Sequence, residues 1–321
     1  MKQKICIIGV YFGILPNYFQ LWLRSCEYNK GVAFYLFTDA DLSKYDIPEN
    51  VRWITFSLEL MRKRASAELG FEAALYTPYK CCDFKPLYGK IFSEYIKEFD
   101  YWGHCDFDLI WGDLVYYFDL YRIKDYDKFL PLGHLSLYRN TDENNARYRL
   151  DGSRNGDYIS VFSKEQNRAF DEENGMVAIF DKHNIPVFKN RIFADISDTY
   201  RRYRCARKDK NYKYQVFFWR KGKTYRAYWK NGEIYEEEFL YVHFQKRGVL
   251  PVYDQCEMAE GFFITNTGFY PLEKITIDII KKYNPYKSFL YEKMEKFINR
   301  LKKRWIPNLF RIIRRICTFK R

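Results

Sequence analysis

The sequence predicts an α/β fold: a mostly parallel sheet flanked by helices, then an antiparallel hairpin region and a basic amphipathic C-terminal helix. Three observations support this prediction. Short apolar runs alternate with segments of helical spacing in the first third of the chain, as in a parallel sheet. Region 212–247 alternates polar and apolar residues around the turn signals "RKGK" and "KNGE", which are typical of β-hairpins. Basic residues accumulate in the last segment, 281–321.

The elements of the parallel layer follow one another along residues 4–112. The second strand is continuously apolar, as expected for a strand buried on both faces. Strands are expected at 4–13, 32–40, 51–57 and around 101–112, and helices at 15–29, after 57 and at 85–99. Ligands of such sheets bind beyond the carboxyl ends of the strands. The Gly9–Gly13 turn, Thr38-Asp39 and Asp106/Asp108 should therefore meet at one edge.

Composition indicates an ordered, globular protein. The chain has 321 residues, 47% hydrophobic and 20% aromatic, which suits one large domain or two small ones and excludes disorder. Eight cysteines without a CxxC pair indicate reduced thiols in a cytosol. No run reaches the roughly 18 apolar residues of a membrane span. We expect a catalytic domain at 1–275 and a basic amphipathic tail at 276–321.

The positive charge is concentrated in the tail. Residues 281–321 hold 14 Lys or Arg and two Glu, so they carry +12 of the formal +13 and leave the body at about +1. Apolar and basic residues interleave at helical spacing, which favours binding to an anionic membrane surface. The alternatives are a helix packed on the domain with a solvated basic face, and an RNA-binding tail, for which no accompanying motif exists.

Two acids interrupt an otherwise apolar stretch, "DYWGHCDFDLIWGDL" at 100–114. Asp106 and Asp108 follow a buried-type strand, and carboxylates at this spacing can face one small volume where a strand ends. Mg²⁺ and Mn²⁺ prefer oxygen ligands and are held by one or two carboxylates plus substrate phosphates. The alternative is an edge strand with solvated acids.

The motifs resemble those of GT-A-type glycosyltransferases over roughly residues 3–250. They are "CDFD" after a βαβ half, "YKCCDFKPLYG" upstream and the late "YVHFQKR". The group most similar is a set of bacterial enzymes of capsular and other surface-polysaccharide synthesis. The resemblance implies a GT-A-like, Rossmann-type sheet and a nucleotide-sugar donor, such as UDP-galactose or UDP-glucose, bound through Mn²⁺ or Mg²⁺.

Residue roles follow from the same resemblance. Asp108 and His243 would ligate the metal, and Asp106 would contact the metal through a water, or the donor ribose. His243 could instead be a satisfied core histidine. Besides Asp106, the predicted donor-binding residues are Gly9, Tyr11, Thr38, Asp39, Lys80, Asp83, Lys85, Lys246 and Arg247. Lys246 and Arg247 would stabilise the leaving diphosphate, and an alternative for Asp83 is a helix N-cap.

The acceptor side is predicted from two further segments. His134 lies where GT-A enzymes build the wall between donor and acceptor, although a core role is equally compatible. Asp171 or Glu172 in "FDEENGM" would serve as the base that takes the acceptor's proton. A solvated acidic loop is the alternative, and retention or inversion stays open.

Together these inferences indicate a cytoplasmic glycosyltransferase, peripheral on the inner face of the cell membrane. It would move a sugar from a nucleotide donor to a hydroxyl of a growing, lipid-linked surface polysaccharide. Two alternatives remain: a non-catalytic, membrane-associated nucleotide-sugar-binding module, and another metal-dependent nucleotidyl- or phosphoryl-transfer enzyme. Hydrolysis of UDP-sugars with Mn²⁺ discriminates among them.

Overall fold

The computed structural model describes residues 3–206, 211–245, 249–253, 255–256, 258–299 and 301. Lys246, Arg247 and the tail beyond residue 301 lie outside these residues. The chain forms two compact units: unit 1 comprises 1–194, 219–224 and 239–243, and unit 2 comprises 195–218, 225–238 and 244–321. This division differs from the predicted boundary between residues 275 and 276, because the hairpin region belongs mainly to unit 2.

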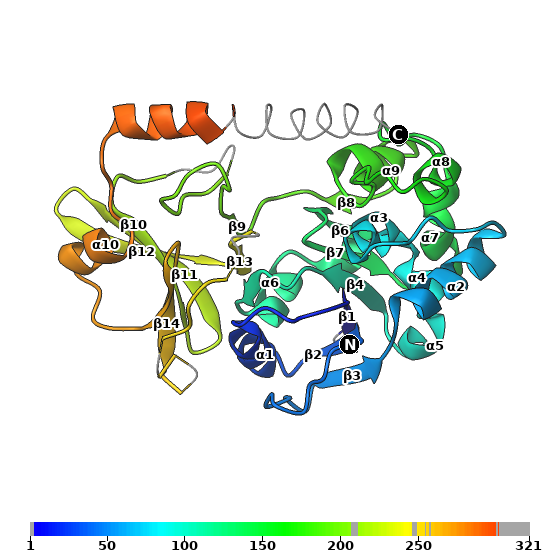
Figure 1. Ribbon diagram of the computed structural model, residues 1–321, viewed down its shortest axis with the longest axis horizontal. Helices are drawn as coiled ribbons and strands as arrows, with labels where there is room; N and C mark the ends of the chain where they lie inside the picture. Colours follow the sequence, from blue (N-terminus) through cyan, green and yellow to red (C-terminus); the bar gives the residue numbers. More distant parts are fainter. Residues whose placement is uncertain are drawn as a thin grey trace, which may run out of the picture. The chain divides into compact units, whose positions relative to one another are not determined.

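Unit 1 is built on a seven-stranded sheet (Figure 1). The strand order is β3 (Val51–Thr55), β2 (Val32–Thr38), β1 (Ile5–Tyr11), β4 (Tyr101–Cys105), β7 (Leu135–Arg139), β6 (Lys128–Leu132) and β8 (Val187–Phe188). The first four strands are parallel, β4–β7 and β7–β6 are antiparallel, and β6–β8 is parallel. The predicted α/β class with a mostly parallel sheet is therefore confirmed.

Helices cover both faces of this sheet (Figure 1). Ile5 and Ile7 of β1 pack in one core with α1 (Phe19–Glu27) and α6 (Leu114–Leu120). Their neighbours Cys6 and Ile8 pack in a second core with α2 (Leu58–Leu69) and α4 (Tyr88–Ile91). Alternate residues of a strand point to opposite faces. A central strand that is apolar throughout therefore requires a helical layer on each side.

The predicted helix at 85–99 is divided into shorter pieces. They are η2 (Lys85–Leu87), α4 and α5 (Ser93–Ile96), and they follow η1 (Pro78–Lys80) and α3 (Cys81–Phe84) directly. Pro86 lies in the first turn of η2. Proline has no N–H to donate and clashes with the preceding turn, so a continuous helix through residue 86 is disfavoured. Lys85 is held at this irregular junction.

Short elements complete unit 1. A small antiparallel pair joins β5 (Leu109–Trp111) to β13 (Tyr241–His243), and the chain passes from unit 1 to unit 2 within β9 (Ala194–Asp195). The remaining elements are η3 (Ile123–Asp125), α7 (Asp142–Ala146), η4 (Arg147–Arg149), α8 (Tyr158–Phe162), the π-helical η5 (Glu173–Val177) and α9 (Ala178–Lys182).

The predicted hairpins form a second sheet, most of which belongs to unit 2. This sheet has the order β12 (Glu233–Phe239), β11 (Lys223–Lys230), β10 (Gln215–Arg220), β14 (Gly261–Thr265) and β15 (Gly268–Pro271). Both residues of each predicted turn, Lys221-Gly222 and Asn231-Gly232, have positive φ, as two-residue hairpin loops require. Helix α10 (Ile277–Tyr283) packs on this sheet through Ile280 and Tyr283.

A helix at 289–299 follows α10 in unit 2. It contacts the rest of the unit through its acidic side: Glu292 forms ion pairs with Arg202 and Arg204 at 2.7 Å each. Its large apolar side chains are exposed instead, namely Phe289, Leu290, Met294, Phe297 and Ile298. Among the described residues, no helix is long and apolar enough to cross a membrane, and the seven described cysteines are free thiols.

Candidate metal and catalytic site

The two acids of the stretch 100–114 lie on either side of a buried aromatic ring. Asp106 follows β4 directly, Asp108 precedes β5, and Phe107 between them packs against Tyr11 and Trp22. Gly9 makes this packing fit, because a Cβ at residue 9 would lie 2.6 Å from Cζ of Phe107. The apolar surroundings of the motif therefore anchor the turn that presents both carboxylates.

Strand pairing brings His243 to the second acid. In the antiparallel register of β13 and β5, His243 is opposite Leu109, the residue after Asp108. Nε2 of His243 lies 3.4 Å from Oδ1 of Asp108. Ligand atoms of Asp106, Asp108 and His243 all lie within 4.8 Å of one another. The structure thus brings together the three residues that were predicted to hold a metal.

The burial of Asp108 makes this cluster suited to a cation. Its side chain is 7% exposed, and Oδ1 has no hydrogen-bond partner among the described residues. A buried carboxylate oxygen without a hydrogen bond is costly unless a cation compensates it. Two carboxylates and an imidazole form a donor set that accepts Mn²⁺ or Mg²⁺, with Mg²⁺ favouring the oxygens.

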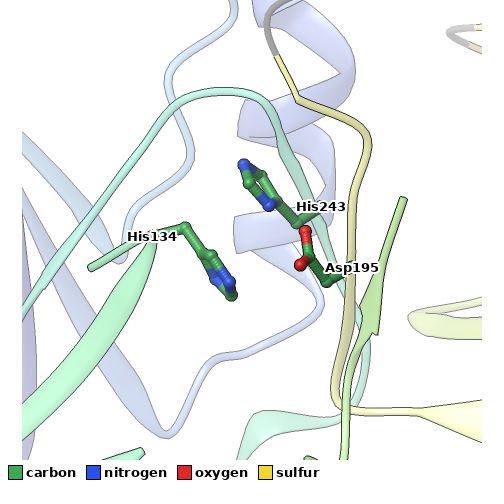
Figure 2. Close-up of side chains that lie close together, drawn as sticks. All are labelled: His134, Asp195 and His243. Atoms are coloured by element: carbon green, nitrogen blue, oxygen red, sulfur yellow. The ribbon is translucent and has the colours of Figure 1, made fainter. Parts of the chain in front are cut away.

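The turn between β6 and β7 supports the cluster from the side. The His134 ring stacks on His243 with 4.2 Å between ring centroids, and Nδ1 of His134 shares a 2.8 Å hydrogen bond with the Tyr241 hydroxyl. The backbone N–H of Asp106 donates to the His134 carbonyl at 3.0 Å. Figure 2 shows the imidazole rings of His134 and His243 near each other. His134 therefore orients the site's backbone and His243.

Lys85 is a buried cation that is hydrogen-bonded to Asp106. Its Nζ donates to Oδ1 of Asp106 at 2.7 Å and to the Gly133 carbonyl at 2.8 Å, and lies 3.3 Å from Oδ2 of Asp171. Burial acts to lower the pKa of Lys85, but the carboxylates of Asp106 and Asp171 outweigh it and raise the pKa well above its usual value. Lys85 is therefore a permanent positive charge between the two acids.

Asp171 and Glu172 lie against the β6–β7 turn. A Cβ at Gly133 would lie 2.1 Å from Oδ2 of Asp171 and 3.0 Å from Oε1 of Glu172. Burial raises the pKa of Asp171, opposed by Lys85. Burial, followed by the charge of Asp171, raises the pKa of Glu172 to about 7. Proton transfer is most effective when the pKa of the group is near the working pH. Glu172 is therefore better suited to this role than Asp171, which is ion-paired with Lys85.

Lys80 and Asp83, which were predicted to contact the donor, are joined to each other and to the segment 161–170. The Lys80 ammonium donates to Asp83 and to the carbonyls of Val161 and Gln166, at 2.7–2.9 Å. Asp83 is fully buried and accepts from the backbone N–H groups of Arg168 and Phe170. It does not cap a helix. The pair fastens the segment that leads into Asp171.

Three further predicted donor residues, Tyr11, Thr38 and Asp39, lie where parallel strands β1 and β2 end. The N–H of Gly13 donates to Oδ1 of Asp39 at 2.7 Å, which links the ends of β1 and β2. Tyr11 lies near Asp108, whose charge adds to burial in raising the pKa of the phenol. Thr38 is fully buried and its hydroxyl accepts from the Ala40 N–H, so this side chain supports the turn.

Three residues near the site were not predicted from the sequence. Tyr241 lies two residues before His243, a spacing that places both on one face of a strand and could have been recognised. Gly133 could not, because its contacts depend on the Asp171 segment. Lys128 stands at the start of the apolar run of β6 and is fully buried; its Nζ donates to the Leu130 carbonyl at 2.7 Å. Burial lowers the pKa of Lys128 to about 7, although Asp171 and Glu172 act to raise it.

Residues 7–273 match the model of a family described as a family of unknown function (DUF6625). No curated protein matches the sequence significantly. Among solved structures, the chain is similar to a crystal structure of the galactosyltransferase LgtC in complex with donor and acceptor sugar analogues. That similarity has 10% identity and a TM-score of 0.33, and it covers 59% of this chain and 75% of the other.

Proposed function

Because the chain belongs to a family of unknown function, DUF6625, we propose a function from the geometry of its site: unit 1 is a metal-dependent glycosyltransferase. Its donor is a nucleotide sugar of the UDP-galactose or UDP-glucose kind. Its acceptor is a hydroxyl of a growing, lipid-linked surface polysaccharide. The observation that carries the proposal is the cluster of Asp106, Asp108 and His243 at the carboxyl edge of a parallel sheet.

The two acids have different roles in this proposal. Asp106 is already paired with Lys85, so part of its charge is neutralised. Asp108 lies beside the imidazole of His243. We therefore assign direct ligation of the metal to Asp108 and His243. Asp106 then contacts the donor ribose or a water on the metal. When bound, a divalent ion would offset the charge that develops on the departing diphosphate.

Glu172 is the proposed base on the acceptor side. Its pKa of about 7 leaves a large deprotonated fraction near neutral pH, so its carboxylate can take the proton of an acceptor hydroxyl. Asp171 is buried and ion-paired with Lys85. It positions that lysine, and through it Asp106, and is not the base.

The test is binding of UDP to the full-length protein by calorimetry, with and without Mn²⁺. Asp108→Asn should abolish the Mn²⁺-dependent binding and the hydrolysis of UDP-sugars, because an amide cannot supply an anionic oxygen. Asp119→Asn removes an exposed acid of α6 and is the matched control, with unchanged binding expected. Normal Mn²⁺-dependent turnover in Asp108→Asn would refute the assignment.

The products identify the class of reaction. Release of UDP and free sugar from UDP-galactose or UDP-glucose supports a glycosyltransferase. Release of UMP instead supports a nucleotidyl- or phosphoryl-transfer enzyme, and binding without hydrolysis supports a non-catalytic module. Each result contradicts the other two, so one donor panel with Mn²⁺ separates the three functions.

We also propose that the protein binds peripherally to the inner, anionic face of the cell membrane through its C-terminal segment. The support comes from the helix at 289–299, whose acidic side faces Arg202 and Arg204 and whose large apolar side chains face solvent. Because the helix packs in this orientation, its apolar face is free to contact lipid. The basic residues that follow in the sequence add electrostatic attraction.

A further inference from the structure

Unit 2 contains a cavity of about 580 Å³, and its lining includes none of Asp106, Asp108 and His243. Its walls come from the helix at 289–299, the segment 198–202, the turn between β14 and β15, and the segment 285–287. This volume is within the range of about 300–1,000 Å³ found for small-molecule sites. The side chains that define its chemistry are Asp198, Arg201, Arg202, Asn266, Thr267, Lys287, Tyr291, Glu292 and Glu295.

The floor of the cavity is a fixed polar network. Arg202 and Glu292 are 8% and 7% exposed, and Nε of Arg202 donates to Oε1 of Glu292 at 2.7 Å. Arg204 holds the other carboxylate oxygen at 2.7 Å, and the backbone N–H of Arg201 donates to Glu295 at 3.1 Å. Apolar residues in place of a buried ion pair often give equal or greater stability. Stability alone therefore does not account for this polar floor, whereas a ligand with polar groups does.

The charges of the lining balance. Three cationic and three anionic side chains face the cavity: Arg201, Arg202 and Lys287 against Asp198, Glu292 and Glu295. A diphosphate or another anion would be favoured by an excess of positive charge, which is absent from this lining. A lipid tail would be favoured by apolar walls, but nearly all of these residues are polar. The lining instead offers closely spaced donors and acceptors beside the Tyr291 ring.

We propose that this cavity binds a neutral saccharide. Sugar hydroxyls donate and accept hydrogen bonds, and they match a surface that carries both kinds of group without a net charge. Asn266 and Thr267 supply an amide and a hydroxyl from the β14–β15 turn, and the ion pairs hold the arginine and glutamate groups in place before the ligand arrives. Binding needs neither the metal nor the nucleotide, so this inference is independent of the proposed transfer reaction.

Saturation-transfer NMR on the full-length protein tests it, with maltotriose and lactose as neutral probes and glucose 6-phosphate and glucosamine as charged comparators. The neutral sugars should receive saturation and the charged ones should not. Arg201→Gln and Asn266→Ala should each weaken binding about fivefold, as expected for the loss of one polar contact. Lys293→Gln removes one positive charge from the same helix outside the lining and should change nothing.

Asn266→Ala keeps the test sharp if Arg201→Gln disturbs the fold, because it removes one amide from a turn and leaves the ion pairs intact. Asp108→Asn should retain saccharide binding, which separates this inference from the proposed function. Three results would overturn it: no saturation of either neutral sugar, stronger binding of the phosphate ester, or binding that is lost only in Asp108→Asn.

Discussion

At the scale of single residues, two aspartates of one motif have been given different surroundings. Asp106 accepts a hydrogen bond from Lys85 and remains partly exposed, with 29% of its side chain accessible. Asp108 is buried beside His243. A cation that enters between them gains most from Asp108, because the charge of Asp106 is already shared with an ammonium. The spacing D-x-D does not predict this difference. It arises from Lys85, 21 positions before Asp106, and from His243, 135 positions after Asp108.

His243→Ala should weaken Mn²⁺-dependent UDP binding with little change in melting temperature. Only the neutral imidazole binds a metal, so wild-type affinity should also fall as the pH is lowered from about 7.5 to 5.5. Calorimetry across this range measures both effects. A large fall in melting temperature with unchanged metal affinity would identify His243 as a core residue.

The raised pKa of Glu172 makes a prediction with a definite sign. As the base, Glu172 must be deprotonated, so the transfer rate should rise with pH around a midpoint near 7, and Glu172→Gln should be slower by 10²–10⁴-fold, typical for a general base. A carboxyl whose pKa is higher in the folded protein favours folding at low pH. Stability should therefore fall as pH rises from about 4.5 to 7.

Melting temperatures at pH 5 and pH 8 check the second effect without any substrate. The wild type should lose more stability over this interval than Glu172→Gln, which cannot ionise at residue 172. Equal losses in both proteins, together with an unchanged rate profile, would exclude Glu172 as the base.

At the scale of elements, the site depends on two strand pairings. The parallel pairing of β1 with β4 places Gly9 opposite Cys105 and next to the Phe107 ring. The antiparallel pairing of β5 with β13 places His243 next to Asp108. A shift of either register by one residue would turn the functional side chain to the opposite face of its strand. The cluster of Asp106, Asp108 and His243 thus depends on the registers as well as on the residues.

Gly9→Ala tests how far the cluster depends on this packing. The added Cβ would lie 2.6 Å from Cζ of Phe107, so the ring must move and displace the acids on either side. We expect a loss of stability of about 1–3 kcal/mol, typical of overpacking, and weaker Mn²⁺-dependent UDP binding. Denaturant titration and calorimetry measure the two.

The double variant Gly9→Ala with Phe107→Leu is the control, because the smaller side chain leaves room for the methyl group. It should recover part of the lost nucleotide affinity. If Gly9→Ala alone binds UDP like the wild type, the close approach of residue 9 to the ring does not position the acids.

The elements that the sequence predicts correctly are those with local signals. The strands of the parallel layer have continuous apolar runs, and the hairpin turns contain Lys-Gly and Asn-Gly, whose positive φ angles follow from local chemistry. The contacts that Lys80 and Asp83 make could not be predicted, because their partners lie 81–87 residues away, in a segment that only the folded chain brings near. Long-range pairing of this kind leaves no periodic pattern to read.

At the scale of the whole molecule, most of the positive charge and the residues that hold the C-terminal helix on unit 2 lie in different segments of the chain. The segment 302–321 contains eight Lys or Arg and no acid, so it carries +8 of the formal +13. If net charge were the only consideration, the basic segment would be removed by truncation near residue 280, where the nearly neutral body ends. That cut would also remove Glu292, which pairs with Arg202 and Arg204. Removing one partner of a buried pair typically costs about 3–5 kcal/mol.

Truncation after Leu301 should therefore keep unit 2 folded, whereas truncation after residue 280 should lower its stability. The chain that ends at Leu301 should retain Mn²⁺-dependent UDP binding and bind phosphatidylglycerol-containing vesicles at least tenfold more weakly than the full chain. The reason is the loss of eight basic residues, each of which contributes about 1 kcal/mol near an anionic surface. Thermal unfolding and vesicle co-sedimentation measure the two effects.

Salt provides the matched control for the full-length protein. Electrostatic attraction is screened within about 10 Å at 0.1 M ionic strength, so vesicle binding should weaken steadily as salt is added and should be weak on purely zwitterionic vesicles. Phe297→Ser, at an exposed apolar position of the helix, should weaken binding further without changing its salt dependence, because it removes apolar contact and no charge. If binding ignores lipid charge, salt and this substitution alike, the C-terminal segment is packed structure and does not attach the protein to a membrane.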